Sequence, residues 1–191
     1  MVKQKTVGII GAGSFGITLI KILTRNVDVI VYTRKQENVD AINNHFYNGQ
    51  IISEKARATN DIAEITTSCD LLFAVVPSSN FRNMVKDFCP YLKPSHIIIH
   101  GTKGLDASRI SDDDWTQLNF SKKDICTMSE VIRQESNVIR VGCISGPNLA
   151  KEILSGQPAA TVIASEFDEV IHLGQTVLAS KIFFAFGSHD I

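Results

Sequence analysis

The sequence predicts an α/β fold in which a doubly wound, mostly parallel β-sheet carries helices on both faces. Two observations lead to this prediction. Short runs of apolar and β-branched residues recur along the chain, and segments with helical spacing of apolar residues separate them. Continuous apolar runs are typical of strands that are buried on both faces, as in a parallel sheet covered by helices. Right-handed crossovers would then wind the sheet in two directions.

The expected strands come first, because their ends determine where a ligand can bind. They span residues 6–10, 28–32, 71–76, 96–100, 138–144, 160–164 and 181–186. Helices are expected over residues 17–23, 80–89, 128–135, 149–154 and 166–178. A chain of 191 residues can build one large core, so we expect a single domain over residues 1–191.

One polar stretch interrupts this alternation. Residues 108–124 contain three consecutive aspartates, starting at Asp112, and the basic pair Lys122 and Lys123. Charge runs of this kind are usually solvated. We therefore expect a polar insertion that leaves the domain as an exposed loop between a strand and a helix.

Charge and hydropathy exclude two classes of partner. The formal net charge is -1 and the pI is about 6.5, so the chain lacks the positive field that nucleic-acid binding needs. No apolar run approaches the ~18 residues of a membrane span. Glycines interrupt the apolar stretch near the N-terminus, which is unlike a secretory signal. We expect a small-molecule partner.

The four cysteines are scattered and form no CxxC pair: Cys69, Cys89, Cys126 and Cys143. This spacing indicates neither a zinc site nor a disulfide framework. We expect no bound metal, and we interpret the cysteines as small buried side chains of a cytoplasmic protein.

The sequence GAGSFG, which begins at Gly11, follows the first strand and opens a helix. Gly11 would permit a tight turn, Gly13 would leave room for a pyrophosphate, and Gly16 would let helix and strand approach closely. With Ser14 and Phe15 at the helix start, the motif predicts a Rossmann-type dinucleotide site whose backbone amides hold the phosphates. The alternative is a glycine-rich turn that serves packing only.

The end of the second strand indicates which dinucleotide is used. NAD-selective domains place an acidic residue there, about 20 residues past the glycines, to bind the ribose 2′-hydroxyl. This sequence has Arg34 and Lys35 instead. A guanidinium can pair with a 2′-phosphate, so Arg34 favours NADP or use of both cofactors. The alternative is a pair of ordinary surface cations.

Polar residues after three further strands are candidates for the rest of the site, since ligands lie beyond the carboxyl ends of such strands. Pro77 and Ser78 follow one strand, with helix capping by a serine as the alternative. Lys103 lies between glycines after the next, where an ammonium could stabilise a developing alkoxide or a phosphate. An ordinary exposed lysine is the alternative there.

The third segment, SGPNLAKE, begins at Ser145 and opens another helix. Pro147 suits the first turn of a helix because its missing donor costs nothing there. Asn148 could then present its amide to a ligand, and the helix N-terminus would favour an anionic one. A capping asparagine without a ligand is the alternative.

Taken together, these ordered motifs resemble bacterial-type NAD(P)-dependent glycerol-3-phosphate dehydrogenase over essentially the whole chain. GAGSFG is similar to that family's GAGSxG, and VPS at residues 76–78 is similar to its VPS turn. Lys103 with Gly104 is similar to its KG turn, and SGPNLAKE is similar to its SGPxxAKE. The resemblance implies that Lys103 and Asn148 contact the substrate. Lys103, Pro77, Ser78 and Ala150 would also line the cofactor site.

The resemblance further implies reversible NAD(P)H-dependent reduction of dihydroxyacetone phosphate to sn-glycerol 3-phosphate. In the family a further lysine acts as acid/base in the segment after the nucleotide-binding domain, and we expect it, with the helical C-terminal domain, to lie beyond residue 191. The isolated chain should then be nearly inactive. A homodimer is a further expectation for the full-length protein.

Two other functions fit parts of the sequence. A related hydroxy-acid or ketopantoate-type reductase shares the fold and the glycine motif, but it should lack the combination around Lys103 and Asn148. A non-catalytic module that senses NAD(H) would need only the glycine turn. Fold alone does not assign function, so both alternatives stand beside the first.

Overall fold

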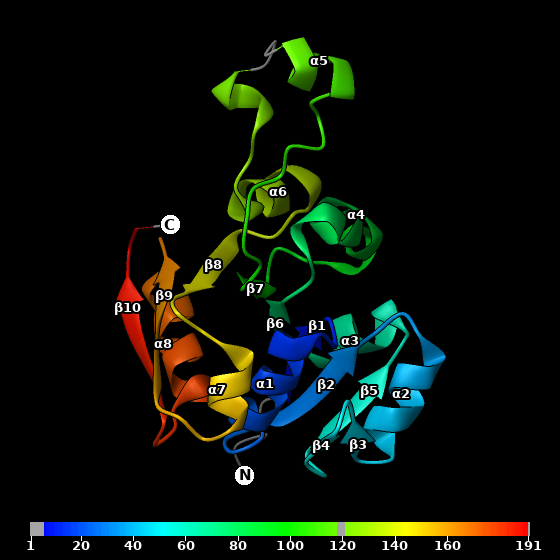
Figure 1. The fold of residues 1–191 in the computed structure, drawn as a ribbon, viewed down its shortest axis with the longest axis vertical. Helices are drawn as coiled ribbons and strands as arrows, with labels where there is room; N and C mark the ends of the chain where they lie inside the picture. The colour runs from blue at the N-terminus through cyan, green and yellow to red at the C-terminus, as the bar shows by residue number, and fades with distance from the viewer. Residues whose placement is uncertain (1–5, 118–120, 191) are drawn as a thin grey trace.

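The computed structural model describes residues 6–117 and 121–190, without the side chains of residues 112, 114 and 115. Within these residues the main sheet has eight strands in the order β10-β9-β8-β7-β6-β1-β2-β5 (Figure 1). The strands are β1 Thr6–Ile10, β2 Asp28–Tyr32, β5 Ala56–Thr59, β6 Leu71–Ala74, β7 Ile97–His100, β8 Arg140–Ser145, β9 Ala159–Ser165 and β10 Phe183–Ser188. A separate hairpin pairs β3 Phe46–Tyr47 with β4 Gln50–Ile51.

Helices cover both faces of this sheet. The helices are α1 Ser14–Leu23, α2 Gln36–Asn43, α3 Ile62–Ser68, α4 Ser78–Phe88, α5 Asp112–Gln117, α6 Met128–Glu135, α7 Ala150–Leu154 and α8 Asp168–Leu178, with 3-10 turns at Cys89–Tyr91 and Lys122–Asp124. Alternate strand residues point to opposite faces, so Ile9 joins the core under α1, α2, α7 and α8, whereas Ile10 joins the core under α3, α4 and α6.

The strand order reverses at β1. This strand pairs in parallel with β2 on one side and with β6 on the other. The chain leaves β1 into the glycine motif and leaves β6 into the Val75–Pro77 turn, so both turns lie at the same edge of the sheet. In doubly wound sheets the crevice at such a switch point is where ligands bind.

The doubly wound α/β prediction is confirmed, and each of the seven expected strands overlaps an observed one. The expected strand over residues 71–76 ends earlier, at Ala74, because Val75 and Val76 leave the sheet and become half-buried at the crevice. Strand β9 is antiparallel to β8 and parallel to β10, so the last two strands run against the rest.

Some elements were not expected from the sequence. Strand β5 reads Ala-Arg-Ala-Thr and lacks the large apolar run by which the other strands were found. Helix α3 is seven residues long and contains four β-branched residues, which weakens the helical pattern. The β3–β4 hairpin turns through Asn48 and Gly49, both at positive φ.

The chain between β7 and α6 leaves the body of the domain (Figure 1). Asp106 and Cys126 close its base with two backbone hydrogen bonds of 2.8 and 2.9 Å. Beyond this base lie helix α5 and the 3-10 turn at Lys122–Asp124. Residues 118–120, part of the predicted insertion, lie outside the described residues.

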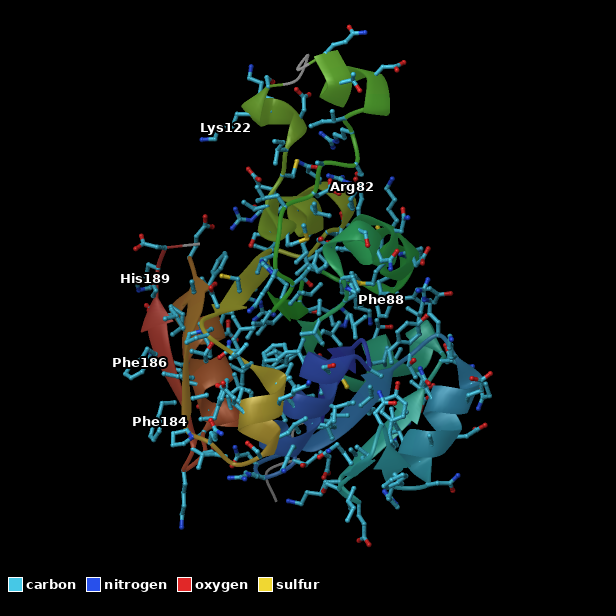
Figure 2. All side chains as sticks on the ribbon, in the orientation of Figure 1. Arg82, Phe88, Lys122, Phe184, Phe186 and His189 are labelled. Atoms are coloured by element: carbon cyan, nitrogen blue, oxygen red, sulfur yellow. The ribbon has the colours of Figure 1, made fainter. Side chains whose placement is uncertain are left out.

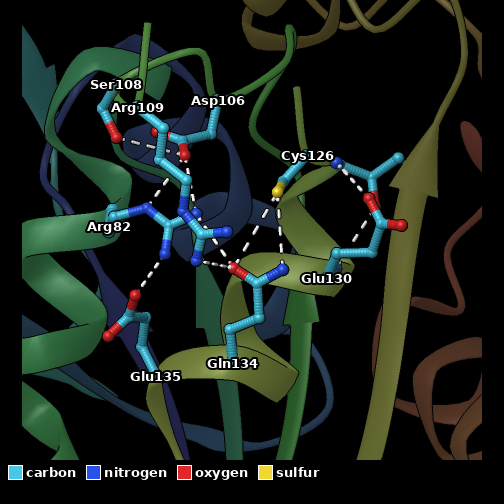
Figure 3. A network of polar contacts seen from close by, with 9 residues as sticks. Arg82, Asp106, Ser108, Arg109, Cys126, Glu130, Gln134 and Glu135 are labelled. Carbon is cyan, nitrogen blue, oxygen red and sulfur yellow. Dashed lines mark hydrogen bonds and ion pairs between the residues drawn. The ribbon is translucent and has the colours of Figure 1, made fainter. Parts of the chain in front are cut away.

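A polar cluster fixes the base of this excursion to the sheet helices (Figure 3). Arg82 of α4 is buried and bonds both to Asp106 and to Glu135 of α6. Gln134 accepts a further bond from Arg82 and one of 2.8 Å from Arg109. Ion pairs and hydrogen bonds therefore fix the base of the excursion, in addition to the buried Cys126.

On the outer face of β10, Phe184 and Phe186 point away from the sheet (Figure 2). Helix α8 packs against this strand, and both phenyl side chains are exposed in the described part of the chain. Among the described residues, no helix combines the length and the apolar character that crossing a bilayer requires.

Candidate functional site

The three glycines after β1 have three different surroundings. Gly11 has φ +114, and a Cβ there would lie 2.8 Å from the carbonyl oxygen of Val75. A Cβ on Gly16 would lie 2.1 Å from the carbonyl oxygen of Gly11. A Cβ on Gly13 would meet no atom of the described residues within 4 Å. Packing therefore requires glycine at positions 11 and 16, whereas the space above Gly13 is open.

Helix α1 begins directly after this open position. Gly13 is its N-cap, with no side-chain cap, and the first turn contains no acidic residue. Ser14 is exposed at the helix start, and Phe15 is half-buried. The first backbone N–H groups of a helix have no partner within the helix, and the helix dipole adds partial positive charge. This end of α1 is therefore suited to hold an anion.

A cavity of about 300 Å³, here called the first cavity, lies beside the glycine turn. Four of the predicted residues line it, namely Gly11, Gly13, Arg34 and Pro77. One helical face adds five residues that sequence reasoning missed: Asn80, Asn83, Met84, Asp87 and Phe88 of α4. Their spacing of three and four residues is the signal that could have found them, because it places them along one side of the helix.

Two aromatic residues, Tyr32 and Phe88, also line the first cavity. Tyr32 at the end of β2 packs edge-on against Phe88, with ring centroids 4.9 Å apart. Burial raises the pKa of the Tyr32 hydroxyl, the charge of Asp87 raises it further, and Arg34 opposes the change. The chain turns into α2 just beyond, where Thr33 donates its backbone N–H to Thr59.

A second cavity, of about 470 Å³, lies at the carboxyl ends of β7 and β8. Phe15, Lys103 and Asn148 are the predicted residues that line it. Lys103 is exposed, and Gly104 after it has φ +108, which glycine adopts without strain. Thr102 donates its hydroxyl to the carbonyl of Val76 over 2.7 Å, so the lysine turn is tied to the turn after β6.

Asn148 is buried in the wall of this second cavity. Its Nδ2 donates to Thr161 Oγ1 over 2.9 Å, and that hydroxyl donates to the carbonyl of Ser145. Its Oδ1 is buried and has no hydrogen-bond partner among the described residues. The N-cap of α7 is Leu149, so the capping alternative for Asn148 is wrong.

The prediction that Pro147 lies in the first turn of a helix is also wrong. Helix α7 starts at Ala150 and is only five residues long. Before it, Gly146 has φ +151, and the backbone N–H of Asn148 bonds back to the Gly146 carbonyl over 2.8 Å. This tight turn, rather than a helical turn, positions Asn148.

His100 is a cavity residue that sequence reasoning missed. It is buried, and its Nε2 lies 2.9 Å from Ser129 Oγ, while its Nδ1 has no hydrogen-bond partner in the part of the chain that the structure describes. Burial lowers the pKa of His100 to about 4, so the imidazole is neutral near pH 7. A histidine that ends an otherwise apolar strand was the available signal.

Four predicted residues do not line either cavity, namely Ser14, Gly16, Ser78 and Ala150. Ser78 is the first residue of α4, and Pro77 is the N-cap. The alternative that a serine caps this helix is therefore wrong. A Cβ on Gly104 would lie 3.3 Å from Ser78 Oγ, which places the serine beside the lysine turn. Ala150 begins α7 and is half-buried. No group of three metal-ligating side chains occurs in the part of the chain described.

Comparison with known proteins gives a consistent result. The family model described as the NAD-dependent glycerol-3-phosphate dehydrogenase N-terminus matches residues 6–171. The glycerol-3-phosphate dehydrogenase [NAD(P)+] of Acinetobacter baylyi is 34% identical over 191 residues, which cover 97% of this chain and 49% of that protein. The chain thus spans about half the length of the curated relatives that it matches.

Solved structures share the fold. The crystal structure of glycerol-3-phosphate dehydrogenase from Coxiella burnetii has a TM-score of 0.83 at 24% identity and covers 98% of this chain and 55% of that one. A PanE/ApbA family ketopantoate reductase from Ralstonia eutropha has a TM-score of 0.66 at 16% identity, over 97% of this chain and 57% of that one. Identities this low show the fold alone.

Proposed function

The chain belongs to the NAD-dependent glycerol-3-phosphate dehydrogenase family, and we propose that it holds NAD(P)H and part of the substrate site for that reaction. The reaction is the reversible reduction of dihydroxyacetone phosphate to sn-glycerol 3-phosphate. The curated relatives are about twice as long as this chain, so the complete activity is proposed for the full-length protein.

One observation carries the proposal of dinucleotide binding. Gly13 is exposed above the N-terminus of α1, and the position of its missing Cβ is empty, while its partner glycines are closely packed. A pyrophosphate can approach the backbone amides only at such a position. A glycine turn that served packing alone would give no reason for glycine at residue 13.

The two cavities divide the proposed binding site. Gly13 lines the first cavity, and Phe15, two residues later, lines the second. The adenosine half of the dinucleotide would lie in the first cavity, and the nicotinamide would reach toward the second. When bound, the nicotinamide supplies the hydride. A substrate carbonyl would then be placed beside Lys103 and Asn148.

The protein groups at the second cavity suit an anionic substrate. The Lys103 ammonium can pair with a phosphate or stabilise negative charge on a carbonyl oxygen as it is reduced. Asn148 Oδ1 has no partner among the described residues and could accept a hydrogen bond from a substrate hydroxyl, while Nδ2 donates to Thr161.

The cofactor is proposed to be NAD or NADP, since Arg34 lines the first cavity and the end of β2 has no acidic residue. A calorimetric titration of the chain with NADPH and with NADH tests the proposal directly. Saturable binding of at least one of them is expected. Absence of binding for both would remove the basis of the proposed function.

The ketopantoate-type and sensor alternatives are less well supported. The family model and the curated relatives concern glycerol-3-phosphate dehydrogenase, whereas the ketopantoate reductase shares the fold only. A sensor would need no lysine turn held to the turn after β6 by Thr102. Assay of the full-length protein with dihydroxyacetone phosphate and with ketopantoate separates these functions.

A further inference from the structure

The first cavity is lined by two charged side chains of opposite sign. Among the described residues that form its wall, these are Arg34, which follows β2, and Asp87, in the last turn of α4. Both side chains are exposed, and no salt bridge in the described part of the chain includes either of them. Each charge is therefore free to meet a ligand.

The position of Asp87 along α4 places it far from the glycine turn. The N-terminal end of α4 adjoins that turn, because a Cβ on Gly11 would lie 3.0 Å from Val76. Asp87 comes nine residues after Ser78, which corresponds to roughly 13 Å along the helix axis. A dinucleotide with its pyrophosphate over Gly13 would thus extend its adenosine toward Asp87.

Tyr32 places the two charges at the same end of the cavity. Its ring packs against Phe88, the neighbour of Asp87, and it precedes Arg34 by two residues. Both charges act on its hydroxyl, in opposite directions, although burial has the largest effect on the pKa of Tyr32. Arg34 and Asp87 therefore flank one aromatic side chain at the adenosine end.

We propose that Asp87 and Arg34 together set the preference between NAD and NADP, with Asp87 supplying from α4 the carboxylate that the end of β2 lacks. This inference rests on the proposed function. The Asp87 carboxylate can accept a hydrogen bond from a ribose hydroxyl of NAD and repels the 2′-phosphate of NADP. The Arg34 guanidinium attracts that phosphate. Opposed charges make both cofactors acceptable.

The two charges can be removed separately. Dissociation constants for NADPH and NADH are measured by calorimetry on the chain and on Asp87→Asn, Arg34→Gln and the double variant. Asp87→Asn should shift the ratio of the two constants toward NADPH by about 3- to 10-fold, the range expected for one partly solvated charge. Arg34→Gln should shift it toward NADH by a similar factor. The double variant should return close to the original ratio.

A matched control is Lys86→Gln, which removes an exposed charge from the same turn of α4 but from a residue that does not line the cavity. It should leave the ratio unchanged. If Asp87→Asn binds both dinucleotides with the original ratio, the role of Asp87 is wrong while the proposed function stands. If the unaltered chain binds neither dinucleotide, both the proposed function and this inference are wrong.

Discussion

Arg82 Nε donates to Asp106 Oδ2 over 2.8 Å, and both side chains are buried. The bond joins α4, which lines the first cavity, to the base of the excursion before α6 (Figure 3). Glu135 of α6 also accepts from the same guanidinium. One arginine therefore holds three segments together.

Replacing Arg82 should strongly destabilise the domain. Arg82→Met would leave the Asp106 carboxylate buried without its cation, and loss of one partner from a buried pair costs about 3–5 kcal/mol. Urea unfolding measures the change. Arg57→Met is the matched control, because Arg57 and its partner Glu64 are both solvent-exposed and such pairs contribute about 1 kcal/mol or less. Equal decreases in the free energy of unfolding for Arg82→Met and Arg57→Met would contradict this account.

Stability should depend on pH through His100. Its folded pKa is about 4, below the ordinary value of 6.5, so between these values the unfolded chain binds a proton that the folded chain does not. The free energy of unfolding should therefore fall as pH decreases from 6.5 to about 4, by at most about 3 kcal/mol from this group.

The variant His100→Gln isolates that contribution, since glutamine does not titrate and can still reach Ser129. Between pH 6.5 and about 4, the free energy of unfolding of this variant should decrease less than that of the unaltered chain. The control is His172→Gln, at an exposed position of α8. Identical pH profiles for the unaltered chain and His100→Gln would show that the buried imidazole is not responsible.

Gly16→Ala tests the packing of the glycine turn. The added Cβ would overlap the Gly11 carbonyl oxygen, which is backbone and has little freedom to move. Overpacking of this kind costs about 1–3 kcal/mol or more. Thermal unfolding should show a clear drop in melting temperature, and an unchanged value would mean that α1 does not pack on the turn as described.

Lys103→Ala tests the proposed substrate site in the full-length protein. Loss of one positioned electrostatic group typically lowers kcat by about 10²- to 10³-fold. We expect a loss of that size in kcat/KM for dihydroxyacetone phosphate, with little change in melting temperature, because Lys103 is exposed. Lys86→Ala should keep full activity. Near-normal turnover by Lys103→Ala would remove this lysine from the site.

The sequence predicted the fold correctly where the same residues determine the local structure and the proposed function. Large β-branched runs identified β1, β2 and β7, and the glycines identified the turn after β1. It was insufficient where tertiary packing decides. Strand β5 lacks large apolar side chains and is specified by its pairing with β2, and Pro147 lies in a turn set by the positive φ of Gly146.

The same distinction applies to the candidate site. Gly13, Arg34 and Lys103 follow strands directly, so their edge of the sheet could be predicted. Asp87 and His100 could not be assigned this way. Asp87 reaches the first cavity because of how α4 lies over the sheet edge. His100 differs from its neighbours in the sequence only as a polar residue at the end of an apolar strand.

The variant Gly13→Ala tests the central claim most directly, because the space at residue 13 is empty in the protein alone and its backbone conformation, φ -74 and ψ -176, suits any residue. Melting temperature and the dissociation constant for NADPH are measured together. We predict an almost unchanged melting temperature and an affinity loss of about tenfold or more, since the methyl group would occupy the place of the pyrophosphate. Unchanged affinity in a folded Gly13→Ala variant would contradict the proposed binding of the dinucleotide at this turn.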